Sequence, residues 1–206
     1  RSTLSRYAPI APAQWVFEPT RHGRPVIVNS EAQAKFLRFN ISHTNDCVVL
    51  ALGNGRELGV DIECTTREAP LAVARRFFSP VEARELDALS AHRQPRRFWD
   101  LWTFKESYIK ARGLGLSLPL DAFSFRFDDE DSVRLELDAS LNDSASRWQL
   151  WQFPLEVRHL LALCAERVHD VPTVVSFRAV VPMRSQRLVA LAPSRVSVPP
   201  SGWQGR

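Results

Sequence analysis

The sequence predicts an α+β fold. Short apolar runs with the alternation typical of strands occupy both halves of the chain, and two well-marked helix signals lie between them. Of the 206 residues, 45% are apolar, which is enough to bury a substantial core. Strands grouped before and after a helical segment are typical of the α+β class.

The amino-terminal part predicts irregular structure followed by strands. Residues 1–25 contain four prolines and predict a helix remnant and then a loop. A first strand is expected over 36–41. The Gly-Asn-Gly sequence at 53–55 is a strong tight-turn signal between the apolar run 48–52 and the alternating run 58–63. These two runs are therefore expected to form a hairpin.

Two helices are expected in the middle of the chain. Residues 79–82, Ser-Pro-Val-Glu, combine a serine cap, a proline in the first turn and a glutamate that can close a capping box. They predict a helix that runs to about residue 89. A second helix is expected over 96–112, with Gly113 as its left-handed terminator.

Four more strands are expected after the second helix, over 123–127, 133–137, 148–152 and 160–165. Residues 183–206 are rich in Pro, Ser, Val and Arg and have no periodicity. This composition predicts a carboxy-terminal segment without fixed structure.

The net charge of +4 arises from the carboxy-terminal segment. Residues 171–206 contain five arginines and no acid, so the rest of the chain carries a net charge of −1. A nucleic-acid partner is not expected, because no continuous basic stripe lies outside this segment. No apolar run is long enough to span a bilayer and no secretory pattern is present, so a cytoplasmic protein without membrane association is expected. Three single cysteines fit neither a disulfide framework nor a zinc site.

Two carboxylates share one face of the strand expected at 58–63. Because side chains alternate along a strand, Asp61 and Glu63 point to the same side. They could bind a hard cation such as Mg²⁺, which prefers oxygen ligands. A solvated acidic face is the alternative interpretation.

Glu106 and Lys110 are four residues apart in the second expected helix and share one of its faces. An ordinary surface ion pair is one interpretation. Two observations favour a functional pair: aromatic residues crowd around it, and two of the three lysines, Lys105 and Lys110, lie here although arginine occurs 24 times. A lysine can release its proton, which an arginine does not readily do.

Three residues nearer the amino terminus could bind phosphate. Ser42 and His43 lie where the first expected strand runs into a turn, and Arg24 lies in a loop between glycine and proline. The alternative is a turn that uses Asn45 and Asp46 for its own hydrogen bonds, with His43 merely exposed.

In combination, these motifs resemble the Sfp-type 4'-phosphopantetheinyl transferases. That family has a GxD strand with a nearby acid, followed by a W-x-x-K-E-x-x-x-K helix, and both are present here at the family's separation. The resemblance covers roughly residues 20–175. The motifs that carry it are Gly23-Arg24-Pro25, Phe39-Asn40-Ile41-Ser42-His43, Gly59-Val60-Asp61-Ile62-Glu63 and Trp102-Thr103-Phe104-Lys105-Glu106-Ser107-Tyr108-Ile109-Lys110.

The resemblance implies a pseudo-dimer of two similar α+β lobes with coenzyme A in the cleft between them. Residues 1–57 would be the remaining part of the first lobe. This lobe is expected to be truncated at its amino terminus, because family members carry several dozen more residues before the position that matches Arg1. Residues 58–175 would form the second lobe with the metal and catalytic residues. Residues 176–206 would be a disordered basic tail, and the protein is expected to be a monomer.

The resemblance also implies transfer of the 4'-phosphopantetheine group from coenzyme A to a serine of an apo acyl or peptidyl carrier protein. Asp61, Glu63 and Glu106 would ligate Mg²⁺. Glu106 would also be the general base, and Lys110 would contact the pyrophosphate and assist the leaving group.

Arg24, Ser42 and His43 would bind phosphates of coenzyme A. The carrier protein would dock near residues Arg112 to Phe127. Its contacts there would be with the leucines Leu114, Leu116 and Leu118 and the arginines Arg112 and Arg126.

Two other functions use the same residues. One is a non-catalytic remnant that binds coenzyme A or a carrier, which the intact Asp61, Glu63, Glu106 and Lys110 argue against. The other is a metal-dependent phosphohydrolase, which would leave Lys110 without a role.

Overall fold

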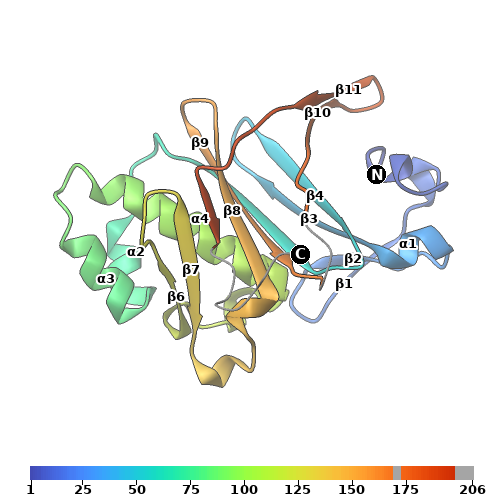
Figure 1. The fold of residues 1–206 in the computed structure, drawn as a ribbon. Helices are drawn as coiled ribbons and strands as arrows, with labels where there is room; N and C mark the ends of the chain where they lie inside the picture. The colour runs from blue at the N-terminus through green and yellow to red at the C-terminus, as the bar shows by residue number, and fades with distance from the viewer. Residues whose placement is uncertain (169–172, 198–206) are drawn as a thin grey trace, which may run out of the picture.

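A six-stranded sheet with a long helix packed on one face forms the centre of the protein (Figure 1). The computed structural model describes residues 1–168 and 173–197. The strands of this sheet, in spatial order, are β5 (Leu58–Cys64), β9 (His159–Glu166), β8 (Trp148–Leu155), β12 (Arg195–Ser197), β7 (Ser132–Leu137) and β6 (Phe123–Arg126). Neighbouring strands are antiparallel, except that β12 runs parallel to β7.

The long helix is α4 (Gln94–Arg112), and it packs against β5 and β9. It begins two residues before its expected start, because a proline is tolerated in the first turn of a helix. It ends where predicted, at Gly113, whose φ of 64° is left-handed. Four short 3-10 helical turns follow α4 in the sequence: η3 (Gly115–Ser117), η4 (Leu120–Ala122), η5 (Ala139–Leu141) and η6 (Ala145–Arg147).

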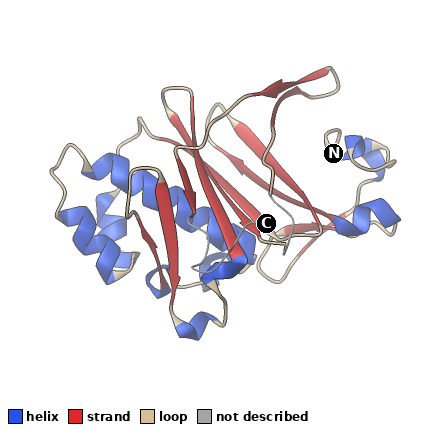
Figure 2. Cartoon of the chain, viewed as in Figure 1, coloured by secondary structure: helices blue, strands red, loops and turns tan. Residues whose placement is uncertain are grey.

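Two shorter helices lie beside α4, as Figure 2 shows. α3 (Pro80–Asp87) has the predicted capping box: the Ser79 hydroxyl accepts from the Glu82 amide, and the Glu82 carboxylate accepts from the Ser79 amide. α2 (Leu71–Phe77) was not expected from the sequence. It ends directly before Phe78, whose ring stacks on Phe98 of α4.

The two faces of β5 have different partners. Leu58, Val60 and Ile62 pack in one apolar cluster with Phe153 and Leu161. The alternate residues face α4, and Gly59 is the point of closest approach. A Cβ atom at Gly59 would lie 2.2 Å from the Ser107 carbonyl oxygen.

α4 is anchored to α3 by a buried ion pair. The Lys105 ammonium lies 2.8 Å from the Glu82 carboxylate, and both side chains are fully buried. Lys105 also donates to the carbonyl oxygens of Leu120 and Phe123, at 2.7 and 2.8 Å. Because every partner is internal, Lys105 has a structural function although it lies next to Glu106.

The amino-terminal part, residues 1–54, forms two small hairpins around a separate apolar cluster, which contains Leu4, Ile10 and Trp15. Its elements are η1 (Leu4–Arg6), η2 (Pro12–Gln14), β1 (Phe17–Pro19), β2 (Pro25–Ile27), α1 (Ala32–Phe36), β3 (Leu37–His43) and β4 (Val48–Asn54). Within this part, residues 1–25 are more regular than the helix remnant and loop expected there, because a short strand, β1, follows the helical turns.

The prediction of a hairpin between residues 48–52 and 58–63 is wrong. β4 pairs with β3, and the turn between them is closed by a hydrogen bond from the Thr44 amide to the Cys47 carbonyl. β5 pairs along its whole length with β9 instead. The β5 side chains that face away from α4 pack with apolar residues of β8 and β9, and this burial outweighs a local turn signal.

The carboxy-terminal segment also differs from the expected disordered tail of residues 176–206. It contains a hairpin, β10 (Phe177–Val181) and β11 (Ser185–Val189), followed by β12. The Phe177 ring packs edge-on against Phe153, with 4.7 Å between centroids, and Arg195 pairs with Asp100 of α4. These long-range contacts leave no periodic signal in the local sequence. Residues 198–206 lie outside the described residues.

The α+β class is confirmed. The internal duplication and the lobe boundaries after residues 57 and 175 stay predictions. No helix among residues 1–168 and 173–197 is both long and apolar enough to cross a membrane.

Replacing Lys105 by methionine should lower the free energy of unfolding by about 3–5 kcal/mol, because it leaves the buried Glu82 carboxylate without its counter-charge. Urea denaturation measures the change. Lys35→Met is the matched control, since Lys35 is exposed and its removal should cost less than about 0.5 kcal/mol. Equal midpoints for the two variants would contradict the structural role of Lys105.

Gly59→Ala should lower the free energy of unfolding by about 2 kcal/mol or more, because its new methyl group meets the backbone of α4. Thermal unfolding provides the measurement. Gly55→Ala separates this clash from backbone strain: Gly55 has a φ of 66° and open space around it, so its replacement should cost only about 1 kcal/mol. A smaller loss at Gly59 than at Gly55 would show that β5 and α4 can move apart easily.

Candidate active site

A cleft of about 300 Å³ lies between the amino-terminal part of the chain and the carboxy-terminal end of α4. The loop before β2 and the strand β3 form one wall, and the last turns of α4 form the other. The lining residues are His22, Gly23, Arg24, Pro25, Phe39, Asn40, Ile41, Glu106, Ile109, Lys110, Gly113 and Gly115.

At this end of α4, Ser42, Asp61 and Lys110 form one hydrogen-bonded group. The Lys110 ammonium donates to Asp61 Oδ1 at 2.7 Å and to Ser42 Oγ at 3.0 Å. The Ser42 hydroxyl donates to the same Asp61 oxygen at 3.0 Å. The three residues come from α4, β5 and β3, so the group joins three elements that are separate in sequence.

Lys110 pairs with Asp61, although the sequence pattern indicated Glu106 as its partner. Glu106 and Lys110 do share a helix face, and both line the cleft. Because Gly59 lets β5 lie directly against α4, the Asp61 carboxylate comes within hydrogen-bonding distance of Lys110.

Glu106 is half-buried and carries a strongly shifted pKa. Its pKa is raised to about 7, mainly by burial and then by the negative charges of Asp61 and Glu63, while Lys110 opposes the shift. A carboxyl group in this state can accept a proton near neutral pH. A cation bound nearby would keep it ionised.

Glu63 is held by two neighbours. The Trp102 indole N–H donates to its Oε1 at 3.1 Å, and Arg67 forms an ion pair with its other oxygen. Burial, followed by repulsion from Asp61, raises the pKa of Glu63, while Arg67 lowers it. The three acids thus influence one another electrostatically.

The three acids are suitable ligands for a hard cation, but they do not form a complete coordination shell by themselves. No cluster of three or more His, Cys, Asp or Glu side chains within the described residues is arranged to hold a metal. Asp61 Oδ2, however, is buried and has no hydrogen-bond partner there. An orphaned carboxylate oxygen beside two further acids fits Mg²⁺, which usually takes one or two carboxylates and completes its shell with water and phosphate oxygens.

The structure separates the three expected phosphate ligands. Ser42 is buried in the group with Asp61. His43 is exposed at the end of β3, on the same side of the strand as Ile41, which lines the cleft. Arg24 lines the cleft, but its guanidinium is bonded to Glu57 at 2.9 Å and to two backbone carbonyls.

The expected carrier-docking segment is only partly accessible. Leu118 is buried in the core, which overturns its assignment to a carrier contact. The Arg112 guanidinium is bonded internally to Asp143 at 2.8 Å. Leu114 and Arg126 are half-buried, and the Leu116 side chain lies outside the described part of the structure.

Two residues of the site, Trp102 and Asn40, were quoted from the sequence only as parts of motifs and were given no role. Trp102 orients Glu63, as above. The Asn40 side chain accepts from the Val60 amide at 2.9 Å and so joins β3 to β5. Its position two residues before Ser42 places both on one strand face, which was the available signal.

Comparison with known proteins shows the family of the chain. Residues 57–164 match the family model of the 4'-phosphopantetheinyl transferase superfamily, and the matched range contains Asp61, Glu63, Glu106 and Lys110.

Individual relatives agree over most of the chain. 4'-Phosphopantetheinyl transferase Sfp of Bacillus subtilis (strain 168) is 35% identical over 180 residues, 86% of this chain and 75% of the relative. 4'-Phosphopantetheinyl transferase psf-1 of Bacillus pumilus is 32% identical over 75% of this chain and 62% of the relative. A phosphopantetheinyl transferase of Thraustochytrium is 28% identical over 81% of this chain and 60% of the relative. The chain therefore belongs to the Sfp-type 4'-phosphopantetheinyl transferases.

Proposed function

We propose that this chain transfers the 4'-phosphopantetheine group of coenzyme A to a serine hydroxyl of an apo acyl or peptidyl carrier protein and releases 3',5'-ADP. The observation that carries the proposal is that Glu106 and Lys110 line one cleft, that Asp61 binds Lys110, and that Asp61 and Glu63 both raise the pKa of Glu106, in a chain of this family. A non-catalytic remnant is not favoured, because all four side chains remain together.

Asp61, Glu63 and Glu106 are the proposed ligands for Mg²⁺. The unpartnered Oδ2 of Asp61 supports this assignment most directly. Glu63 is already bonded to Trp102 and Arg67, so its part would be smaller than that of Asp61. When bound, the ion would supply charge neutralisation at the pyrophosphate of coenzyme A.

Glu106 is the proposed general base. It would take the proton of the carrier serine hydroxyl, whose oxygen then forms a bond to the β-phosphorus of coenzyme A. The bond from that phosphorus to the bridging pyrophosphate oxygen breaks, and the electron pair leaves with 3',5'-ADP. Lys110 faces the same cleft and would hydrogen-bond or protonate the departing oxygen.

His43 is the proposed phosphate contact of β3. It is exposed, and no internal partner for its ring is present among the described residues. Arg24 would contribute differently, because its bonds to Glu57 and to the Ala111 carbonyl fix the end of the helix that carries Lys110. Its charge would still favour an anionic ligand in the cleft.

For the carrier protein, the proposed docking surface is the accessible part of the segment from Arg112 to Phe127. Leu114 is half-buried and borders on Gly113 and Gly115, which line the cleft. Arg126 is paired with Glu85 on α3 and could exchange this partner for an acidic group of the carrier. A monomeric state and a cytoplasmic location stay predictions.

Incubation with coenzyme A, Mg²⁺ and an apo-carrier should add one phosphopantetheine mass to the carrier, detected by mass spectrometry. Asp61→Asn should reduce the initial rate at least about 100-fold, because the amide keeps the shape but loses the charge proposed to bind the cation. Its unfolding should stay cooperative, at a lower temperature than in the wild type, because Lys110 loses its charged partner.

The matched control is Asp128→Asn, which alters an exposed acid paired with Arg134 on β7. It should transfer at the wild-type rate. A wild-type rate in Asp61→Asn would remove the central assignment, and release of inorganic phosphate without a carrier would favour a phosphohydrolase.

Removal of divalent cations should abolish transfer. Activity lost in EDTA should return when Mg²⁺ is added in excess, whereas EDTA already saturated with Mg²⁺ should have no effect. Mg²⁺ should also raise the unfolding temperature of the wild type more than that of Asp61→Asn, because a ligand stabilises the state that binds it. Full transfer in the chelator would contradict a metal-dependent mechanism.

A further inference from the structure

The Ser42 hydroxyl lies where β3 of the amino-terminal part meets β5 and α4, which carry the proposed metal ligands and Lys110. Ser42 is on β3 and is 6% exposed. Its oxygen accepts from the Ile62 amide of β5 at 3.3 Å and from the Lys110 ammonium at 3.0 Å, and its proton is donated to Asp61 at 3.0 Å.

These three bonds use the whole capacity of the group. A serine hydroxyl has one donor and two acceptor positions. A phosphate oxygen could bond to Ser42 only by displacing Asp61 as the recipient of its proton. Because that displacement would break a buried charge-assisted hydrogen bond, direct phosphate binding by Ser42 is unfavourable.

Lys110 has one donor position left. Its ammonium carries three N–H groups, of which two are directed at Ser42 and Asp61. With two of the three held, the ammonium cannot rotate freely about its bond to the side chain. Its side chain is 26% exposed and lines the cleft, where the third N–H group can meet a ligand.

We propose that Ser42 is a positioning residue for Lys110 and not a ligand of coenzyme A phosphate. It holds the ammonium against Asp61, so that the remaining N–H group has a fixed direction when the leaving group departs. Ser42 also fixes the Asp61 carboxylate, which leaves Oδ2 as its unpartnered oxygen. The inference rests on the proposed role of Lys110.

The test compares kcat and KM for coenzyme A in Ser42→Ala and Ser42→Thr, with coenzyme A affinity measured separately by calorimetry. Ser42→Ala should lower kcat about 10–100-fold, the usual cost of losing a group that orients a functional side chain. KM and the dissociation constant for coenzyme A should change less than about twofold, because no contact with coenzyme A is lost. Ser42→Thr keeps the hydroxyl and should recover most of kcat.

Ser197→Ala is the matched control. Ser197 is 8% exposed on β12, and its hydroxyl accepts from the Leu150 amide at 3.0 Å and from Arg167 at 3.2 Å. It therefore loses bonds from a backbone amide and from a cationic side chain, as Ser42→Ala does at Ile62 and Lys110, but away from the cleft. Its kcat should equal that of the wild type even where its unfolding temperature falls.

Three results would overturn the proposal: a raised KM with unchanged kcat in Ser42→Ala, an equal loss of kcat in Ser197→Ala, or no recovery in Ser42→Thr. If Ser42→Ala does not fold, Ser42→Cys replaces it, since a thiol fills the site but hydrogen-bonds weakly. Full kcat in Lys110→Met would instead refute the proposed role of Lys110, and absence of transfer by the wild type would refute the proposed function.

Discussion

The close approach of β5 to α4 at Gly59 is the constraint on which the site depends. A side chain at this position would meet the backbone of α4 at Ser107 and Ala111, so the strand and the helix can touch only because glycine has no Cβ atom. The contact brings Asp61, two residues along the strand, to 2.7 Å from the Lys110 ammonium. In the GxD pattern, the glycine is therefore needed for packing, and the aspartate supplies the carboxylate that binds Lys110.

The two lysines of α4 differ in burial and in the partners that they bind. Lys105 is fully buried, and its partners are Glu82 and backbone carbonyls, so its charge is satisfied internally. Lys110 is partly exposed and keeps a donor for a ligand. Glu106 lies beside both and has a raised pKa, because burial removes water from it and Asp61 repels its charge. The site therefore has an excess of negative charge that a cation would relieve.

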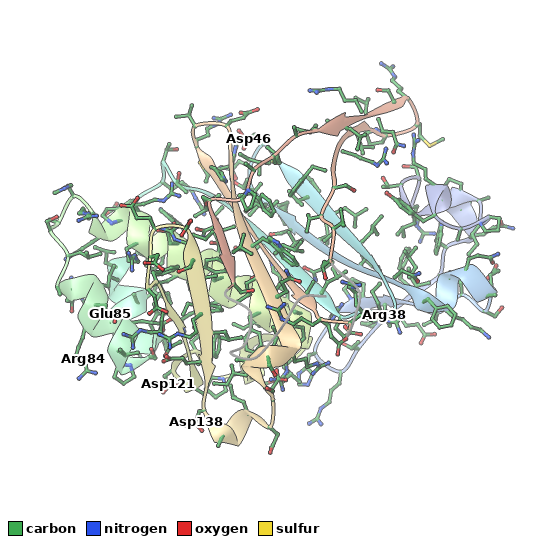
Figure 3. The ribbon with its side chains drawn as sticks, viewed as in Figure 1. Arg38, Asp46, Arg84, Glu85, Asp121 and Asp138 are labelled. Carbon is green, nitrogen blue, oxygen red and sulfur yellow. The ribbon has the colours of Figure 1, made fainter. Side chains whose placement is uncertain are left out.

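The junction between β3 and β5 is made by side chains and not by a backbone ladder. Asn40 and Ser42 accept from the amides of Val60 and Ile62, which occupies the outer edge of β5. Beyond this junction, Asp46 in the turn between β3 and β4, labelled in Figure 3, contacts His159 at the start of β9 at 2.9 Å. The cleft lies along the same junction, and Asn40, which joins the two parts of the chain, is also one of its lining residues.

Local sequence determined the elements whose signals are local. The capping box of α3, the glycine that ends α4 and the shared face of Asp61 and Glu63 follow from caps and periodicity, and the family follows from their combination. Tertiary structure alone decided the partners: β4 pairs with β3, β12 enters the sheet between β7 and β8, and Lys110 binds Asp61. The physical reason is that caps and side-chain periodicity depend on residues close together in the sequence. The pairing of strands and of charged side chains depends on which surfaces become buried together in the folded chain.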